Sequence, residues 1–182
     1  MPGDEAVTAS EWSESEVVVH ARRGEPEALA ALYHRYGKRV FGLAWRLTGS
    51  RADAEDVVQD LFVGLPEALK RYEDRGRLDA WLRAVVVRLV LMHKRSERRR
   101  REVALTPGDV RSAPPDGGIL NRADLDGALR ALPDTMRTVF VLKALEGYTH
   151  AEIGALLGIR AGTSEVRYHR AVRRLRAVLK EP

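Results

Sequence analysis

The chain has 182 residues, a net charge of +5 and no cysteine, which excludes a disulfide framework and a thiolate zinc site. No apolar run approaches the ~20 residues that span a membrane. The polar, acidic start MPGDEAVTASEWSESE lacks the basic start and apolar stretch of a secretory signal. We therefore expect a cytoplasmic, soluble protein with no membrane insertion.

Apolar residues recur at helical spacing through the first half of the chain. One helix is expected from near Pro26 to Gly49, which stops it. Ser50 is the expected N-cap of a second helix. Pro66 should kink or end that helix, because proline lacks an N–H and clashes with the preceding turn. A third helix starts near Leu78 and continues into a basic stretch. No segment shows sustained strand alternation.

The helical pattern then stops, and turn-forming residues fill the segment 104–121. A stretch of this length without helical periodicity is too long for a loop inside one domain. It therefore predicts a flexible linker between two domains. The expected fold class is all-α, with two small helical domains at 14–103 and 122–182.

The second domain reads as a four-helix unit that ends in a helix–turn–helix. Thr149 and Glu152 fit a capping box, a hydroxyl cap with a carboxylate three residues later. The helix that they open closes at Gly158, and the last helix starts near Thr163.

Charge is unevenly distributed along the chain. Residues 94–101, KRSERRRR, hold six basic residues and one acidic residue, and residues 160–182 hold seven basic and two acidic residues. Residues 51–74 reverse the balance, with seven acidic against three basic residues. Basic patches attract polyanions and an acidic surface repels them. The two basic segments therefore suit nucleic acid, whereas the acidic segment suits a protein partner.

Nothing in the sequence indicates catalysis. The five histidines are scattered, and there is no glycine-rich phosphate loop or nucleophile elbow. His150-Ala151-Glu152 matches the start of a deaminase motif, which needs cysteines to hold zinc. We expect no enzyme, no metal site and no cofactor.

The last helix combines an apolar face with a basic stripe of the shape that enters a major groove. The stripe consists of Thr163, Val166, Arg167, Arg170, Arg173 and Arg174. The alternative is an ordinary packing unit whose basic face is merely solvated. Glu165 falls at the edge of the apolar face and in the expected first turn, where the helix dipole favours a carboxylate. It is therefore either a dipole-stabilising residue or a base contact.

Two long segments resemble one known family. ARRGEPEALAALYHRYGKRVFGLAWRLTGSRADAEDVVQDLF is similar to the N-terminal conserved region (region 2) of bacterial RNA polymerase sigma factors of the extracytoplasmic-function (ECF) group. LRALPDTMRTVFVLKALEGYTHAEIGALLGIRAGTSEVRYHRAVRRLR is similar to their C-terminal promoter-binding region (region 4). The resemblance covers about 150 residues, in the order of the family and with its linker.

The resemblance implies a transcription-initiation factor whose partners are core RNA polymerase, through the β′ clamp helices and the β flap, and promoter DNA. An anti-sigma factor is a further candidate partner. The implied polymerase contacts are Asp53, Glu55, Asp56, Gln59, Asp60 and Phe62. The implied contacts to the −10 element are Tyr72, Arg75, Arg77, Arg83, Arg88, Met92, Lys94 and Arg95. The implied contacts to the −35 element are Thr149, Arg160, Thr163, Glu165, Val166, Arg167, Arg170, Arg173 and Arg174.

Three departures from the family pattern concern DNA specificity. Arg88 stands where members often have Asn, and Met92 where they have Asp. Glu165-Val166 replaces a basic residue followed by Ser. Two alternatives remain open: a helix–turn–helix regulator that acts without the polymerase, and an interaction protein such as an RNA-binding adaptor.

Overall fold

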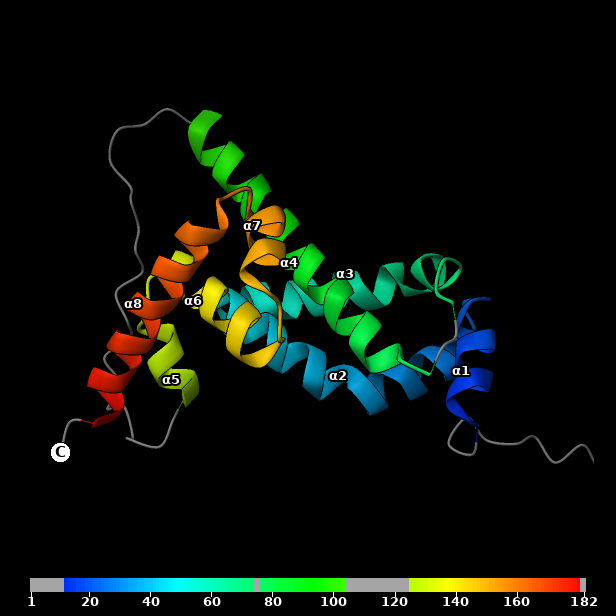
Figure 1. Cartoon of the computed structure of the whole chain (residues 1–182). Coiled ribbons are helices and arrows are strands. Elements are labelled where there is room, and N and C mark those ends of the chain that lie inside the picture. Colours follow the sequence, from blue (N-terminus) through cyan, green and yellow to red (C-terminus); the bar gives the residue numbers. More distant parts are fainter. Residues whose placement is uncertain (1–11, 74–75, 104–124, 181–182) are drawn as a thin grey trace, which may run out of the picture. The chain divides into compact units, whose positions relative to one another are not determined.

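The computed structural model describes residues 12–73, 76–103 and 125–180, and they are helical with no strand among them (Figure 1). The first helices are α1 (Glu14–Ala21), α2 (Pro26–Thr48), α3 (Arg51–Leu69) and α4 (Leu78–Val103). The later helices are α5 (Leu125–Arg130), α6 (Asp134–Phe140), the π-helical turn η1 (Val141–Leu145), α7 (His150–Leu157) and α8 (Ala161–Lys180). The all-α fold class is confirmed, and the expected linker, 104–121, lies outside the described residues.

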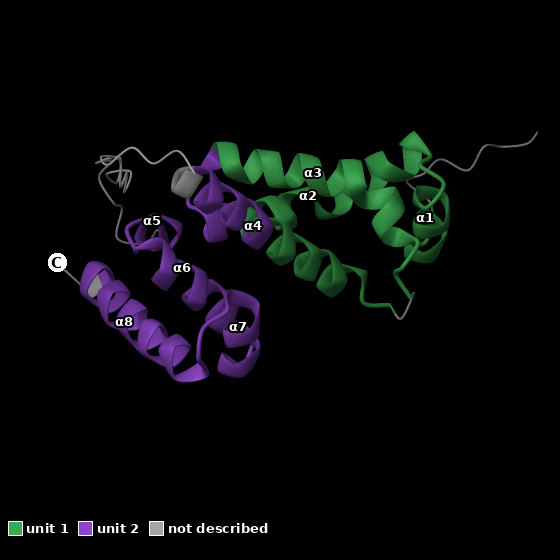
Figure 2. Cartoon of the chain, turned by 90° about the horizontal axis from the view of Figure 1, so that it is seen from above, with its two compact units in different colours: residues 1–44, 52–90 green, residues 45–51, 91–182 purple. Residues whose placement is uncertain are grey.

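The chain forms two compact units (Figure 2). The first contains residues 1–44 and 52–90, and the second contains residues 45–51 and 91–182. The end of α2 and the second half of α4 thus belong to the same unit as the C-terminal helices. The boundaries expected from the sequence, 14–103 and 122–182, stay a prediction.

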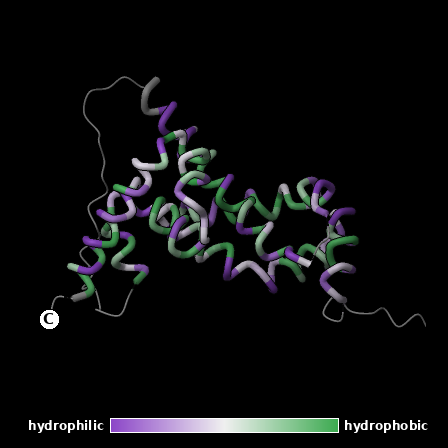
Figure 3. The backbone as a smooth tube through the Cα atoms, in the orientation of Figure 1, coloured by the Kyte–Doolittle hydropathy of each residue, from purple (hydrophilic) through white to green (hydrophobic). Residues whose placement is uncertain are grey.

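The core of the first unit is made of the apolar stripes of its helices. Apolar and polar residues alternate along each helix at helical spacing (Figure 3). Leu32 of α2, Leu61 and Leu65 of α3, and Leu78 and Leu82 of α4 are at most 2% exposed. Burial of this kind stabilises a folded chain by roughly 1.5–3 kcal/mol for each large side chain.

Helix α1 was not expected from the sequence, although a local signal for it exists. The Ser13 hydroxyl accepts a bond from the Glu16 N–H, and the Glu16 carboxylate accepts one from the Ser13 N–H. This capping box opens a helix that buries Val17, Val18 and Ala21. The helix is short and buries few residues, so its apolar periodicity is weak.

Helix α3 does not end at Pro66, and an end at that position was a wrong prediction. The helix continues to Leu69 and then tightens, with i→i+3 bonds such as Tyr72 N–H to the Leu69 carbonyl at 3.0 Å. Leu65 and Leu69 on either side of the proline are fully buried. Their packing offsets the one hydrogen bond that proline removes.

In the second unit, α8 packs against α5, α6 and α7 (Figure 1). Helix α6 passes directly into η1, and the chain then turns at Gly147, whose φ is +77°. The expected capping box of Thr149 and Glu152 opens α7, and Gly158 closes it in the left-handed conformation. These helix ends were predicted correctly, because each depends on residues that are neighbours in sequence.

The turn between α7 and α8 brings two backbones unusually close together at Gly154. The Ile159 N–H donates to the Gly154 carbonyl at 3.0 Å. A Cβ on Gly154 would lie 2.7 Å from the Ile159 carbonyl oxygen, which is a backbone atom and cannot swing away. Only glycine therefore fits this position of the helix–turn–helix.

We expect Gly154→Ala to destabilise the protein by about 1–3 kcal/mol, the usual cost of overpacking a close contact. Gly162→Ala in α8 is the matched control, because no heavy atom lies within 4 Å of its added Cβ. Alanine in a helix is favoured over glycine by up to ~1 kcal/mol. Urea unfolding followed by circular dichroism measures both changes, and equal stabilities would contradict the close-contact argument.

Candidate polymerase and nucleic-acid interface

The acidic surface lies on α3. Its exposed residues are Glu55, Asp56, Gln59 and Asp60, whereas Asp53 and Phe62 are half-buried. The Phe62 ring meets the Tyr33 ring of α2 edge-on, with centroids 5.0 Å apart. Helical periodicity keeps Val57 and Leu61 in the core while the acids face solvent. The structure therefore places all six expected polymerase contacts along one helix.

The expected −10 residues are less uniformly placed. Tyr72 is only 6% exposed and packs against Trp81 of α4, with ring centroids 5.1 Å apart. Its ring would have to leave this packing to contact a base. Arg77 and Arg88 are exposed, and Met92 is 53% exposed.

Two further −10 candidates are Arg83 and Arg75. Arg83 is half-buried, and its Nε lies 3.3 Å from the Asp79 carboxylate, one helical turn away. Arg75 lies outside the described residues.

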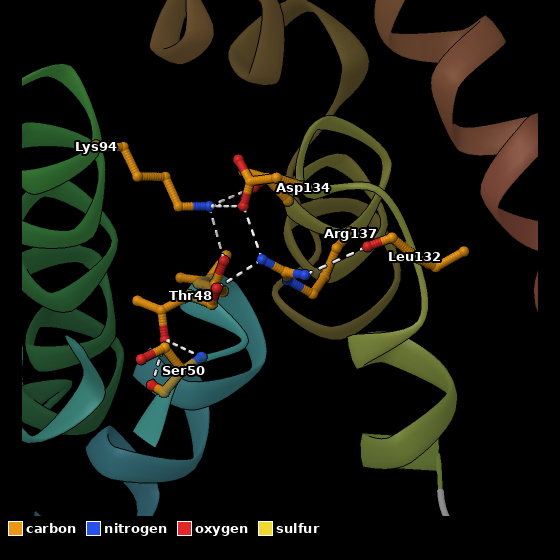
Figure 4. Close-up of polar contacts among 8 residues, drawn as sticks. Thr48, Ser50, Lys94, Leu132, Asp134 and Arg137 are labelled. Atoms are coloured by element: carbon orange, nitrogen blue, oxygen red, sulfur yellow. Dashed lines mark hydrogen bonds and ion pairs between the residues drawn. The ribbon is translucent and has the colours of Figure 1, made fainter. Parts of the chain in front are cut away.

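Lys94 has a structural role within the second unit (Figure 4). Its ammonium donates to the Leu47 carbonyl at 2.8 Å, to the Asp134 carboxylate at 2.6 Å and to the Thr138 hydroxyl at 3.0 Å. These three bonds use all three donors of a lysine. Burial lowers the pKa of Lys94, and the adjacent Asp134 carboxylate offsets part of that shift.

Arg137 shares the same carboxylate (Figure 4). Its Nη2 donates to Asp134 at 2.7 Å and to the Thr48 carbonyl at 2.6 Å, and its Nη1 donates to the Leu132 carbonyl at 3.3 Å. Gly49, with φ +76°, leaves room for this guanidinium, since a Cβ there would lie 2.7 Å from its central carbon. Lys94 and Arg137 thus cap the last carbonyls of α2, and Asp134 balances both charges.

Arg95, another expected −10 residue, also bonds a helix end. Its Nη2 donates to the Leu156 carbonyl near the end of α7 at 2.7 Å. Nearby, the Arg46 guanidinium pairs with Asp126 of α5 at 2.7 Å. Lys94 and Arg95 are therefore engaged with backbone carbonyls in this structure, which the sequence did not indicate.

The basic stripe of α8 is largely accessible to solvent. Thr163, Arg170, Arg173 and Arg174 are exposed, Val166 is 50% exposed and Arg167 is half-buried. Thr149, the N-cap of α7, and Arg160, the residue directly before α8, are exposed as well.

The buried side of α8 includes a polar contact that sequence reasoning missed. Ser164 is fully buried, and its hydroxyl lies 2.9 Å from Nδ1 of His150, the first residue of α7. Ala171 and Leu175 continue the buried side of the helix. The serine thus ties α8 to α7 at the helix–turn–helix, and a wheel that ranks residues by hydropathy does not place it in the core.

Helix α8 begins at Ala161, two residues before the expected start, and this corrects the interpretation of Glu165. Glu165 is the fifth residue of the helix, and no acidic residue lies in the first turn. It is also exposed. Because the helix dipole acts within the first turn, the dipole-stabilising role loses its basis.

No helix in the described part of the chain is long and apolar enough to cross a membrane. Within the same residues, no group of three or more metal-ligating side chains is placed to hold an ion.

Comparisons with known proteins identify both halves of the chain. Residues 32–100 match the family described as Sigma-70 region 2, and residues 122–175 match Sigma-70, region 4. The chain is 32% identical to the ECF RNA polymerase sigma factor SigE of Mycolicibacterium smegmatis, over 96% of this chain and 74% of that protein. It is 34% identical to the RNA polymerase sigma factor CarQ of Myxococcus xanthus, over 88% and 94%.

A solved structure agrees with these matches. The chain resembles the sigma factor RpoE of Bartonella quintana, solved in complex with the anti-sigma factor NepR. The TM-score is 0.51 and the sequence identity 25%, over 81% of this chain and 94% of that one.

Two helical sigma-70 regions in this order define a sigma factor. The chain belongs to the ECF group of RNA polymerase sigma factors, and it directs the polymerase to promoters to initiate transcription. A helix–turn–helix regulator that acts without the polymerase is not favoured, because such a protein needs no region 2.

The shared carboxylate predicts a measurable coupling between Lys94 and Asp134. We expect a double-mutant cycle of Lys94→Met and Asp134→Asn to give a coupling energy of about 1–3 kcal/mol in urea unfolding, because the ammonium is buried. The control cycle joins Glu67 of α3 and Lys70, the residue after the helix, an exposed pair that should couple by less than about 0.5 kcal/mol. Equal couplings would show that burial does not strengthen the first pair.

Proposed function

We propose that three charged surfaces, the acidic surface of α3 and the basic surfaces of α4 and α8, each make a different contact during transcription initiation. The observation that carries the proposal is the separation of exposed acids on α3 from exposed bases on α8 and along α4. An acidic surface is repelled by DNA and is free to meet a basic protein surface, whereas a basic helix suits a groove lined by phosphates.

In this proposal, the acidic surface of α3 binds the β′ clamp helices of core polymerase. Asp56, Gln59 and Asp60 supply charge and hydrogen-bond acceptors, and they are exposed. Phe62, half-buried against Tyr33, supplies an apolar edge beside them. The region-4 segment, 122–182, meets the β flap.

The turn between α3 and α4, with the exposed face of α4, contacts the −10 element in this proposal. Arg77, Arg88 and Met92 are exposed and able to meet DNA without rearrangement. Lys94 and Arg95 must first leave their carbonyl partners to do so. Arg88 and Met92 differ from the family pattern, so the −10 sequence preference should differ as well.

Helix α8 reads the −35 element in the same proposal. Arg170 can donate two hydrogen bonds to a guanine edge, and Val166 can pack against a thymine methyl group. Glu165, exposed in the second turn, can accept from a cytosine amine. The remaining bases of the stripe, among them Arg173 and Arg174, attract phosphates without regard to sequence.

The proposal also covers regulation and location. We propose that an anti-sigma factor binds this chain, since the structurally similar RpoE was solved with one. The protein acts in the cell interior, where core polymerase is found, and contributes no catalytic activity of its own. The segments 14–103 and 122–182 serve as the polymerase/−10 and −35 domains.

Charge reversal tests the polymerase contact. Asp56→Lys combined with Asp60→Lys should abolish co-purification with core polymerase, because two exposed acids become bases on the proposed contact surface. Glu67→Lys with Glu73→Lys is the control: both residues are exposed, and the net charge changes by the same amount. Circular dichroism checks that each variant stays helical, and polymerase binding that survives the first pair would contradict the assignment.

Selection of −35 sequences from a random pool tests the reader helix. Holoenzyme carrying Arg170→Ala should lose about 1–3 kcal/mol of discrimination at one base pair. Glu165→Gln should alter the preference at a different base pair, because an amide donates as well as accepts. Arg176→Ala, an exposed base outside the stripe, is the control. If Glu165→Gln leaves the selected −35 sequence unchanged, Glu165 does not contact a base.

A further inference from the structure

Arg22 holds the start of the turn between α3 and α4 although it lies far from that turn in sequence. Its Nε donates to the Leu69 carbonyl at 3.0 Å, and its Nη2 donates to the Tyr72 carbonyl at 2.6 Å. Arg22 follows α1 and precedes the region-2 match, which begins at residue 32. The region-2 match therefore does not include this residue.

The end of α3 gains a charged donor from elsewhere: the Leu69 carbonyl already accepts the Tyr72 N–H at 3.0 Å, and Arg22 adds a second bond to it. The last four carbonyls of a helix have no partner within the helix and carry partial negative charge. Helix α3 has no basic residue in its last turn. The planar guanidinium of Arg22 bonds the carbonyl of Leu69, the last residue of α3, and that of Tyr72, three residues further on. It therefore fixes the direction in which the chain leaves the helix.

Arg22 is itself held in place by α1. Its backbone N–H donates to the Val18 carbonyl at 3.0 Å, which continues the hydrogen bonding of α1. Val17, Val18 and Ala21 are at most 1% exposed, so α1 is anchored in the core of the first unit. The Glu14 carboxylate, at the other end of α1, accepts a hydrogen bond from the Tyr36 hydroxyl of α2.

The far side of the turn is anchored as well. The Tyr72 ring packs on Trp81, and Leu78, the first residue of α4, is 1% exposed. Gly76, with φ +65°, allows a reversal between these anchors that other residues rarely adopt. Arg22 adds a polar contact to these apolar ones, because it donates to the backbone carbonyl of Tyr72, whose ring packs on Trp81.

We infer that Arg22 is a positioning residue for promoter opening: by holding the Leu69 and Tyr72 carbonyls, it fixes residues 70–73, which lead from α3 toward the place where an unpaired base of the −10 element is received. The inference rests on the proposed assignment of the turn between α3 and α4 to the −10 element. Extruding a base costs free energy, and holding residues 70–73 in place beforehand avoids a further entropic cost at that moment.

The test compares Arg22→Ala and Arg22→Lys with Arg23→Ala. Arg23 is the neighbouring residue, with 66% of its side chain exposed and only a 3.8 Å contact to Glu25. Each variant is assembled with core polymerase on a promoter fragment selected by the wild-type holoenzyme. Permanganate reactivity of unpaired thymines measures opening, and binding to the closed duplex is measured separately.

Arg22→Ala should slow opening by about tenfold, the effect of losing a charged hydrogen bond, without changing closed-duplex binding. Lysine keeps the charge but cannot bridge two carbonyls with a planar fork, so Arg22→Lys should fall between wild type and alanine. Arg23→Ala should open at the wild-type rate. If Arg22→Ala does not fold, Arg22→Lys decides, and wild-type opening by that variant overturns the inference.

A spectroscopic measurement reports on the turn directly. The chain has three tryptophans, Trp12, Trp45 and Trp81. Changing the first two to Phe leaves Trp81 as the reporter of its packing with Tyr72. Adding Arg22→Ala to that chain should increase acrylamide quenching of Trp81, whereas adding Arg23→Ala should not. If Arg22→Ala leaves the acrylamide quenching of Trp81 unchanged, Arg22 does not hold the turn in place.

Arg77→Ala separates this inference from the proposal on which it rests. Arg77 is exposed in the turn, and its loss should impair opening if the turn meets the −10 element. Impaired opening by Arg77→Ala together with normal opening by Arg22→Ala overturns only the role of Arg22. Normal opening by both variants overturns the assignment of the turn and the inference together.

Discussion

Both units depend on basic side chains that cap the C-terminal ends of helices. Arg22 caps α3, Lys94 and Arg137 cap α2, and Arg95 donates to the end of α7. The helix dipole makes these ends partly negative, and neither α3 nor α7 has a basic residue in its own last turn. Each donor therefore comes from a distant segment, and each cap also joins two parts of the chain.

This use of cations changes how the charge of the protein should be understood. A basic stretch on a DNA-binding protein suggests phosphate contacts, and residues 94–101 have that composition. Lys94 and Arg95 nevertheless each donate to a backbone carbonyl, and Asp134 neutralises part of the buried charge. The bases of α8 differ, because Arg170, Arg173 and Arg174 are exposed. Burial, more than charge count, separates Lys94 and Arg137 from the exposed bases of α8 that we propose contact DNA.

The helix–turn–helix shows how a few close contacts set which side chains of α8 are exposed. Gly154 permits the approach of the Ile159 carbonyl, and the Ser164 hydroxyl meets His150. Together with the start of α8 at Ala161, these contacts fix which side of α8 is buried. Glu165 is exposed as a consequence, next to Val166. A shift of two residues in the helix start is small, yet it removes the electrostatic reason for an acid at that position.

The helical fold class, the ends of several helices and the separation of acidic from basic segments were all predictable from the amino-acid sequence. These features are local: a glycine with positive φ such as Gly158, or a capping box such as that of Thr149, acts over a single turn. The resemblance to sigma factors was visible for the same reason, since it rests on runs of residues.

Other features become apparent only in the folded chain: the passage of α3 through Pro66, the burial of Tyr72 and Ser164, and the structural roles of Arg22, Lys94 and Arg137. The folded chain also groups residues 45–51 and 91–103 with the C-terminal helices. These features depend on contacts between different helices, among them contacts between residues as much as 89 positions apart. Local propensity contains no information about such partners, because their free energy arises only once the chain has folded.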